Sequence, residues 1–244
     1  LNAAASIAII GAADGPTAIV VAQALASKYL GPITIVAYSY MALVPIIQPA
    51  VVKLMTTKKE RLIRMDYNPM QVSRTTKILF PIVVTVVAGL IAPKSLALVG
   101  FLMFGNLLRE CGVLRLMSET AQNILANLIT LLLGLTIASQ MRGEAFLQLE
   151  TLLILALGLL AFVFDTAAGV GFAKLMNLFS KKKLNPMIGA AGISAFPMSA
   201  RVIQKMGLKE DPTNHLLMHA IGANVSGQIA SAIVGGLIIS LVLV

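Results

Sequence analysis

The sequence predicts an all-α polytopic membrane protein, transporter-like and built from inverted repeats, with broken helices or re-entrant hairpins. Three observations predict this fold class. Of the 244 residues, 58% are hydrophobic and only 12% are charged, whereas soluble domains carry about 25% charged residues. Charge-free stretches follow one another along the chain, and two of them are interrupted by glycine and proline in a similar way. We therefore expect residues 1–244 to form a single integral membrane domain.

The charge-free stretches predict six membrane crossings. A helix spans a bilayer with about 20 apolar residues, and the crossings are expected at 30–52, 78–93, 95–112, 120–141, 151–173 and 216–240. The broken segment at 184–200 is expected to re-enter on the side from which it came. With this topology, all Lys and Arg residues except Lys28, Lys94 and Arg142 fall on one side. Because basic loops stay in the cytoplasm, the 53–77 loop is predicted to be cytoplasmic, and the protein to lie in the inner (cytoplasmic) membrane of the cell.

Charge and chain start add two further expectations. The net charge of +9 indicates cytoplasmic loops and no nucleic-acid partner, since no basic run is interleaved with the aromatic residues that bind single strands. The chain begins at Leu1 inside an apolar run, without Met or a basic flank. We interpret it as the C-terminal portion of a longer chain whose upstream helices are missing here.

The two interruptions share one pattern. Residues 11–18 and 185–197 both contain Gly-Ala-Ala, a second glycine and then a hydroxyl residue or proline. Paired Gly/Pro interruptions in the two halves of a repeat transporter indicate a binding site near the bilayer midplane. Irregular backbone persists at that depth only where protein or a water-filled cavity satisfies its polar groups. The sequence therefore predicts a site formed by both segments.

Asp14 is the main candidate site residue. A charged side chain at the bilayer centre costs at least about 2.5–3.5 kcal/mol, so Asp14 requires a partner or a function. We interpret it as a site where a proton and a hard cation compete, and the alternative is a carboxylate that caps a half-helix. Asp165 is the other acidic residue deep in apolar sequence, and the sequence assigns it no role.

Oxygen ligands and one cation accompany Asp14. Hard cations prefer the oxygens that the broken segment and the last crossing supply in Asn185, Ser194, Asn224 and Ser226. Asn224 and Ser226 can equally join helices by hydrogen bonds, and Tyr40 can either donate to the site or lie at an interface. Arg201 directly follows the second interruption, where a guanidinium suits an anionic substrate.

These stretches resemble the beta subunit of the biotin-dependent, sodium-pumping decarboxylases, which act on oxaloacetate, methylmalonyl-CoA or glutaconyl-CoA. The matching stretches are 11–18, 37–45 with 58–61, 105–112, 185–202 and 217–225. The resemblance implies that Asp14 binds sodium and protons, that Asn185, Ser194 and Asn224 belong to the Na⁺ sites, and that Tyr40, Gly189 and Arg201 lie on the coupling path.

The resemblance also implies a mechanism and partners. A carboxytransferase alpha subunit loads carboxybiotin, a biotin carrier subunit brings it to the cytoplasmic face, and its decarboxylation consumes a proton and drives Na⁺ outward. A small membrane gamma or delta subunit and the lipid bilayer are further partners, and a homo-oligomer is expected within the complex. Our hypothesis is that Arg201 orients the carboxylate of carboxybiotin while Asp14 exchanges sodium for a proton.

Two other functions remain open from the residues alone. The same broken segments can serve a sodium-coupled secondary transporter of a small carboxylate. A passive membrane anchor for soluble subunits is the third possibility, but it leaves Asp14 without a purpose.

Overall fold

The computed structural model describes residues 1–67, 71–140 and 143–243, and every regular element in these ranges is helical. The all-α prediction is therefore confirmed, while Arg142, used above for the charge distribution, lies outside the described residues. The longer helices are α2 (Gly15–Ala24), α3 (Leu30–Met55), α5 (Arg74–Ile91), α6 (Leu96–Glu110), α8 (Ala126–Gln140), α10 (Leu149–Phe179), α11 (Met198–Glu210) and α12 (Leu217–Val242). The shorter elements are α1 (Asn2–Ala8), η1 (Ile9–Ala12), α4 (Lys58–Arg61), η2 (Pro93–Ser95), α7 (Arg115–Thr120), η3 (Ala121–Leu125), α9 (Gly143–Phe146) and η4 (Pro186–Gly192).

Five helical stretches in the described part are long and apolar enough to cross a bilayer, and they correspond to five of the six predicted crossings. They are Leu30–Met55, Arg74–Ile91, Arg115–Ser139, Leu149–Phe179 and Leu217–Val242. The sixth, expected at 95–112, is α6, which has 15 residues and is therefore about 22 Å long. It is shorter than expected because the helix ends at Glu110, just before Gly112 with its positive φ of 75°.

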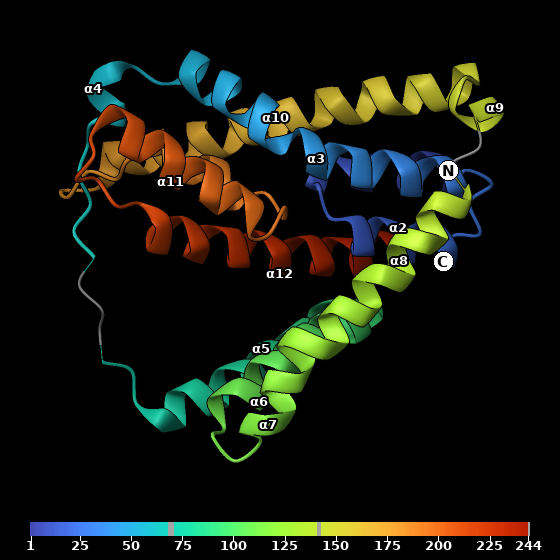
Figure 1. The fold of residues 1–244 in the computed structure, drawn as a ribbon, viewed down its shortest axis with the longest axis horizontal. Coiled ribbons are helices and arrows are strands. Elements are labelled where there is room, and N and C mark those ends of the chain that lie inside the picture. The colour runs from blue at the N-terminus through green and yellow to red at the C-terminus, as the bar shows by residue number, and fades with distance from the viewer. Residues whose placement is uncertain (68–70, 141–142, 244) are drawn as a thin grey trace.

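The helices form a core and an arm (Figure 1). In the core, α3, α10 and α12 run lengthwise; α3 packs beside α10, while α2, η4 and α11 pack between these two helices and α12. The arm consists of α5 to α8, and it meets the core where Gly236 of α12 lies directly against the backbone of Ser95 in η2. The arm exposes many large apolar side chains, as expected of lipid-facing helices; examples are Val83, Val87, Leu128, Leu131, Leu132 and Leu135.

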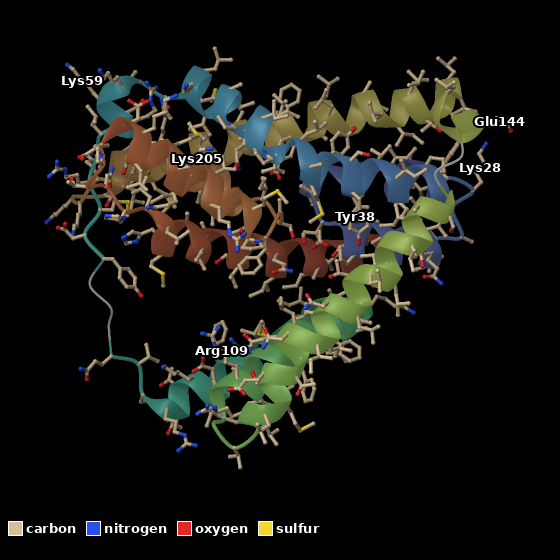
Figure 2. The ribbon with its side chains drawn as sticks, viewed as in Figure 1. Lys28, Tyr38, Lys59, Arg109, Glu144 and Lys205 are labelled. Atoms are coloured by element: carbon tan, nitrogen blue, oxygen red, sulfur yellow. The ribbon has the colours of Figure 1, made fainter. Side chains whose placement is uncertain are left out.

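The long axis of the molecule separates two ends. Figure 2 shows Lys59 at one end and Lys28 at the other, and we refer to them as the Lys59 end and the Lys28 end. Helix α3 connects the two, because it begins at Leu30 and ends at Met55.

The first interrupted segment forms a hairpin, here called hairpin 1, which starts and finishes at the Lys28 end. Elements α1 and η1 run inward, the chain turns at Ala13 and Asp14, and α2 returns. The Asn2 side-chain amide donates to the Leu25 carbonyl oxygen at 3.2 Å, which joins the two limbs at their base. Ile10, Val21 and Val36 of α3 bury the hairpin in one apolar cluster.

The second interrupted segment forms hairpin 2, which starts and finishes at the Lys59 end. Element η4 runs inward, the chain turns at residues 193–197, and α11 returns. Both limbs are tied to the end of α4 and the residues that follow it, because Asn185 donates to the carbonyl oxygens of Arg61 and Ile63, and Arg61 pairs with Glu210 at 2.7 Å. The Gly-Ala-Ala of each interruption stands in the 3₁₀ limb or at its end.

The two hairpins enter from opposite ends and meet at their tips. The Ser194 backbone N–H donates to the Ala12 carbonyl oxygen at 3.2 Å. Opposed hairpins that cross in this way are what an inverted repeat produces. The membrane re-entry predicted for 184–200 and the cytoplasmic position of 53–77 remain predictions about the bilayer.

Candidate functional site at the hairpin crossover

The crossover carries a buried carboxylate held by two hydroxyl groups. Ser194 Oγ of hairpin 2 donates to Asp14 Oδ2 at 2.9 Å, and Ser231 Oγ of α12 donates to the same oxygen. The two hydroxyl oxygens are 3.0 Å apart, and the three residues are all buried. Three segments that are far apart in the sequence therefore place their oxygens around one point.

The backbone around Asp14 is specialised. Ala13 adopts a left-handed conformation with φ 53°, which is uncommon for a residue with a side chain and costs of order 1 kcal/mol or more. Asp14 is the N-cap of α2, and its Oδ1 accepts from the Thr17 backbone N–H at 3.1 Å. The capping alternative is therefore correct for one carboxylate oxygen, while Oδ2 faces the serine hydroxyls.

One face of α12 forms the other wall of the crossover. Asn224 Nδ2 donates to the Ile193 carbonyl oxygen at 2.6 Å, while its Oδ1 is buried without a hydrogen-bond partner among the described residues. Gly227 lies against the Gly192 carbonyl group, where a Cβ atom would come within 1.9 Å of the oxygen. Asn224, Gly227 and Ser231 are spaced i, i+3 and i+7, so they share one helix face.

Two cavities flank the crossover. The first has a volume of about 400 Å³, contains Asp165, Ser194 and Ser231 in its lining, and extends past Ile238 toward the Lys28 end. The second has a volume of about 720 Å³ and extends past Met176 toward the Lys59 end. They share Gly192, Gly227 and Ala230 in their linings, so they adjoin each other at the crossover.

Asp165 lies at the level of the crossover. It stands on α10 four residues after Ala161, against which Gly11 packs, and four before Gly169, against which Gly189 packs. One helix face thus contacts the 3₁₀ limbs of both hairpins, with Asp165 between the two contacts. The sequence assigned Asp165 no role, and the structure shows it between the two hairpin contacts of α10 and in the lining of the first cavity.

Asn185 and Tyr40 do not join this group. Asn185 Oδ1 caps η4 by accepting from the Met187 N–H at 3.1 Å, and its amide is held at the Lys59 end. Seven residues of 3₁₀ helix, about 14 Å, separate it from the tip. The Tyr40 hydroxyl donates to the Leu155 carbonyl oxygen of α10. Tyr38, by contrast, lies with its ring against Gly15, directly after Asp14.

Gly189 and Arg201 occupy different parts of hairpin 2. Gly189 permits direct backbone contact with Gly169 of α10, since a Cβ atom there would come within 2.1 Å of the Gly169 oxygen. Arg201 is exposed in the first turns of α11, on the Lys59 side of the crossover. None of the ion pairs within the described ranges involves its guanidinium.

Sequence analysis missed two residues that the structure brings into hairpin contacts. Ser231 follows Asn224 by seven residues, and this helical spacing was the available signal. Gln48 is fully buried in α3, where its Nε2 donates to the Ala190 carbonyl oxygen at 2.7 Å and contacts Ser199 Oγ at 2.5 Å. A polar residue in an apolar helix was the signal at this position.

Crossed hairpins around a buried carboxylate define a class: polytopic membrane proteins with a binding site near the midplane, as in ion-coupled transport proteins. The chain belongs to the family of Na⁺-transporting oxaloacetate decarboxylase beta subunits, whose sequence model matches residues 1–242. The resemblance seen in the motifs is thereby confirmed.

Curated relatives agree with this assignment. The chain is 54% identical over 238 residues to a methylmalonyl-CoA decarboxylase subunit beta of Propionigenium modestum, covering 98% of this chain and 60% of the relative. It is 53% identical over 243 residues to an oxaloacetate decarboxylase beta chain of Klebsiella pneumoniae, covering 100% of this chain and 56% of the relative. The chain therefore spans somewhat more than half the length of these relatives.

Proposed function

We propose that this chain is the sodium-translocating part of a biotin-dependent decarboxylase, in which decarboxylation of carboxybiotin drives Na⁺ out of the cell. The observation that carries the proposal is the crossover itself: two serine hydroxyls contact Asp14, and Asn224, which donates to the Ile193 carbonyl oxygen next to Ser194, has a buried Oδ1 without a hydrogen-bond partner among the described residues. Family membership favours this function over a secondary transporter of a carboxylate, and the buried carboxylate argues against a passive anchor.

The ligands of the crossover suit an alkali cation. Carboxylate, hydroxyl and amide oxygens are hard ligands. Within the described residues no group of three or more His, Cys, Asp or Glu side chains is placed to hold a metal ion. In our proposal Asp14, Ser194 and Asn224 bind Na⁺ together with Ser231, and the serine hydroxyls turn their lone pairs toward the cation. Asp165 attracts cations into the cavity beside them, because it is a carboxylate in its lining.

Decarboxylation takes place at the cytoplasmic side in this proposal. The biotin carrier brings carboxybiotin to the Lys59 end, and Arg201 orients its carboxylate. Loss of CO₂ leaves the electron pair of the broken C–N bond on the biotin ureido nitrogen, which takes up one proton. A proton that displaces Na⁺ from Asp14 supplies it, so each proton consumed is tied to release of sodium on the opposite side.

The remaining assignments belong to the same proposal. The partners are a biotin carrier subunit, a carboxytransferase alpha subunit and a small gamma or delta membrane subunit. The complex lies in the inner membrane and contains several copies of the chain. Relatives named for methylmalonyl-CoA and for oxaloacetate are 54% and 53% identical to this chain. Because relatives named for two different substrates are almost equally similar to this chain, the similarity supports a soluble subunit, and not this chain, as the part that selects the acid to be decarboxylated.

The test is turnover and transport by the reconstituted complex with Asp14→Asn. The proposal requires sodium-dependent CO₂ release and export of sodium-22 to fall at least 100-fold, because an amide cannot exchange a cation for a proton. Asp66→Asn removes an exposed carboxylate and serves as the matched control. Unchanged export by the Asp14 variant contradicts the site, and substrate uptake by the chain alone that is insensitive to avidin supports the secondary transporter.

A further inference from the structure

A groove with a cationic rim lies between α3 and α11 in the half of the core toward the Lys59 end. It has a volume of about 210 Å³ and is lined by Pro45, Pro49 and Lys53 of α3 and by Val202, Lys205 and Lys209 of α11, among others. We call it the lysine groove. It is separate from the two crossover cavities, with which it shares no lining residue.

The lining changes from apolar to cationic along the groove. Pro45, Pro49 and Lys53 follow one another at four-residue spacing, so they share one face of α3 and extend over about 12 Å. On α11, Val202 lies nearest the hairpin tip, and Lys205 and Lys209 follow toward the Lys59 end (Figure 2). Both walls therefore run from an apolar inner part to a basic outer part.

The three ammonium groups are free to bind an anion. None of the ion pairs between described residues involves Lys53, Lys205 or Lys209. The carboxylate of Glu210, which also lines the groove, is held instead by Arg61 Nε at 2.7 Å. The rim thus presents three positive charges with no competing free carboxylate in its lining.

The groove reaches the depth of lipid headgroups. Helix α3 has 26 residues, about 39 Å, which exceeds the roughly 30 Å hydrocarbon core of a bilayer. Lys53 is two residues from its end and therefore lies near the membrane surface, while Pro45 lies within the apolar region. Basic pockets between membrane helices on the cytoplasmic side bind anionic headgroups.

We propose that the lysine groove binds one anionic phospholipid. The phosphate group contacts Lys53, Lys205 and Lys209, and the upper part of one acyl chain lies on Pro45, Pro49 and Val202. A small anion such as free phosphate would use the basic rim alone, and an acidic protein surface would not need an apolar floor that continues toward the bilayer centre. The apolar inner part of the groove matches the acyl chain of a phospholipid, and the basic outer part matches its phosphate group.

The test uses native mass spectrometry of the purified complex titrated with phosphatidylglycerol, and with phosphatidylcholine of the same acyl chains. We expect one phosphatidylglycerol to bind selectively. In the Lys53→Gln, Lys205→Gln, Lys209→Gln triple variant, affinity falls about fivefold per lysine removed. The matched control is Lys181→Gln, Lys182→Gln, Lys183→Gln, which removes the same charge elsewhere at the Lys59 end. The triple Lys→Arg variant keeps the charge and is expected to bind like the wild type.

Four outcomes would overturn the proposal. Full retention of phosphatidylglycerol by the Gln variant means that the groove is not the site, and an equal loss in the control variant means that only overall charge matters. Displacement by millimolar inorganic phosphate indicates a site for a free anion. A raised KM for carboxybiotin in the Gln variant, together with unchanged binding of phosphatidylglycerol, would mean that the three lysines bind the biotin carrier and not a lipid.

Discussion

Ser194 and Ser231 differ from several other serines of the chain in what their hydroxyl groups bind. Ser39, Ser226 and Ser240 donate to backbone carbonyl oxygens four residues earlier, which is common for serine in a helix. Ser194 donates to a buried carboxylate instead, and Ser231 contacts the same carboxylate as well as the Gln228 carbonyl oxygen three residues earlier. A hydrogen bond to a charged group contributes more than one to a neutral group, so these two hydroxyls help to hold the Asp14 side chain in place at the crossover.

Removal of one hydroxyl should weaken sodium binding without unfolding the protein. We expect Ser231→Ala to raise the half-saturating Na⁺ concentration about 10- to 150-fold, since the hydroxyl is a proposed ligand of the ion and a polar contact with a charge contributes about 1.5–3 kcal/mol. The measurement is carboxybiotin decarboxylation by the reconstituted complex as a function of sodium. Ser240→Ala, on the same helix, should leave the curve unchanged. An equal shift in both variants would indicate a general effect on α12.

Residue type predicted part of the site. Asp14, Ser194 and Asn224 were expected to converge, and the structure brings them to the crossover. Asn185 was assigned to the same group, but Asn185 followed by Pro186 is also a cap sequence, and capping is what the structure shows. Polar side chains near a break can bind either a ligand or the backbone, and the sequence alone does not distinguish these two uses.

At the scale of elements, contact between backbones holds the hairpins against α10 and α12. Gly189 meets Gly169, and Gly227 meets Gly192, so any larger residue would separate the segments. The sequence predicted that both segments break, but it did not predict that hairpin 1 turns back. The return is accompanied by contacts between residues far apart in the sequence, such as Asn2 with Leu25 and Ile10 with Val36 of α3, which lie outside any local pattern.

Two glycines of α12 provide a matched test of this packing. Gly227→Ala should lower the unfolding temperature of the complex in detergent by several degrees, because overpacking costs about 1–3 kcal/mol. Gly222 has nothing within 4 Å of the position of a Cβ atom, so Gly222→Ala should be neutral or slightly stabilising, as alanine favours a helix. The opposite order of the two variants would contradict the close contact at Gly192.

The base of hairpin 2 should depend on pH through Asp211. Its carboxylate accepts from the Thr213 N–H and hydroxyl and from Arg64 Nε at 2.7 Å, and these hydrogen bonds, those of Thr213 first, lower the pKa of Asp211 from 3.8 to about 2. The unfolded carboxyl group binds a proton more readily. The stabilisation is therefore complete above about pH 4 and is lost as the pH falls through about 2.

The pH dependence can be measured by thermal unfolding of the wild type and of Asp211→Asn. At pH 5 the variant should unfold at the lower temperature, and the two curves should converge at acidic pH, where the wild-type carboxyl group is also neutral. Parallel loss of stability in both proteins would show that other carboxyl groups cause the acid sensitivity.

At the scale of the whole molecule, two hairpins that enter from opposite ends require that the ends face opposite sides of the membrane. Lys28 and Lys59 mark these ends (Figure 2), and from the distribution of basic residues we expect the Lys59 end to face the cytoplasm. Composition predicted the class, and the charge-free stretches predicted five of the helices that are long and apolar enough to cross a bilayer. The separation of core from arm was not predictable, because both carry similar apolar helices.

Cysteine labelling tests this arrangement. Cys111 must first be replaced by Ser, because it is a free cysteine whose thiol can itself react with the maleimide. A membrane-impermeant maleimide should then label Lys59→Cys only from the cytoplasmic side, in inside-out vesicles, and Lys28→Cys only in right-side-out vesicles. Labelling of both from one side would mean that α3 does not cross the bilayer. The hairpins would then open to the same compartment, and sodium entering from one side would have no separate exit.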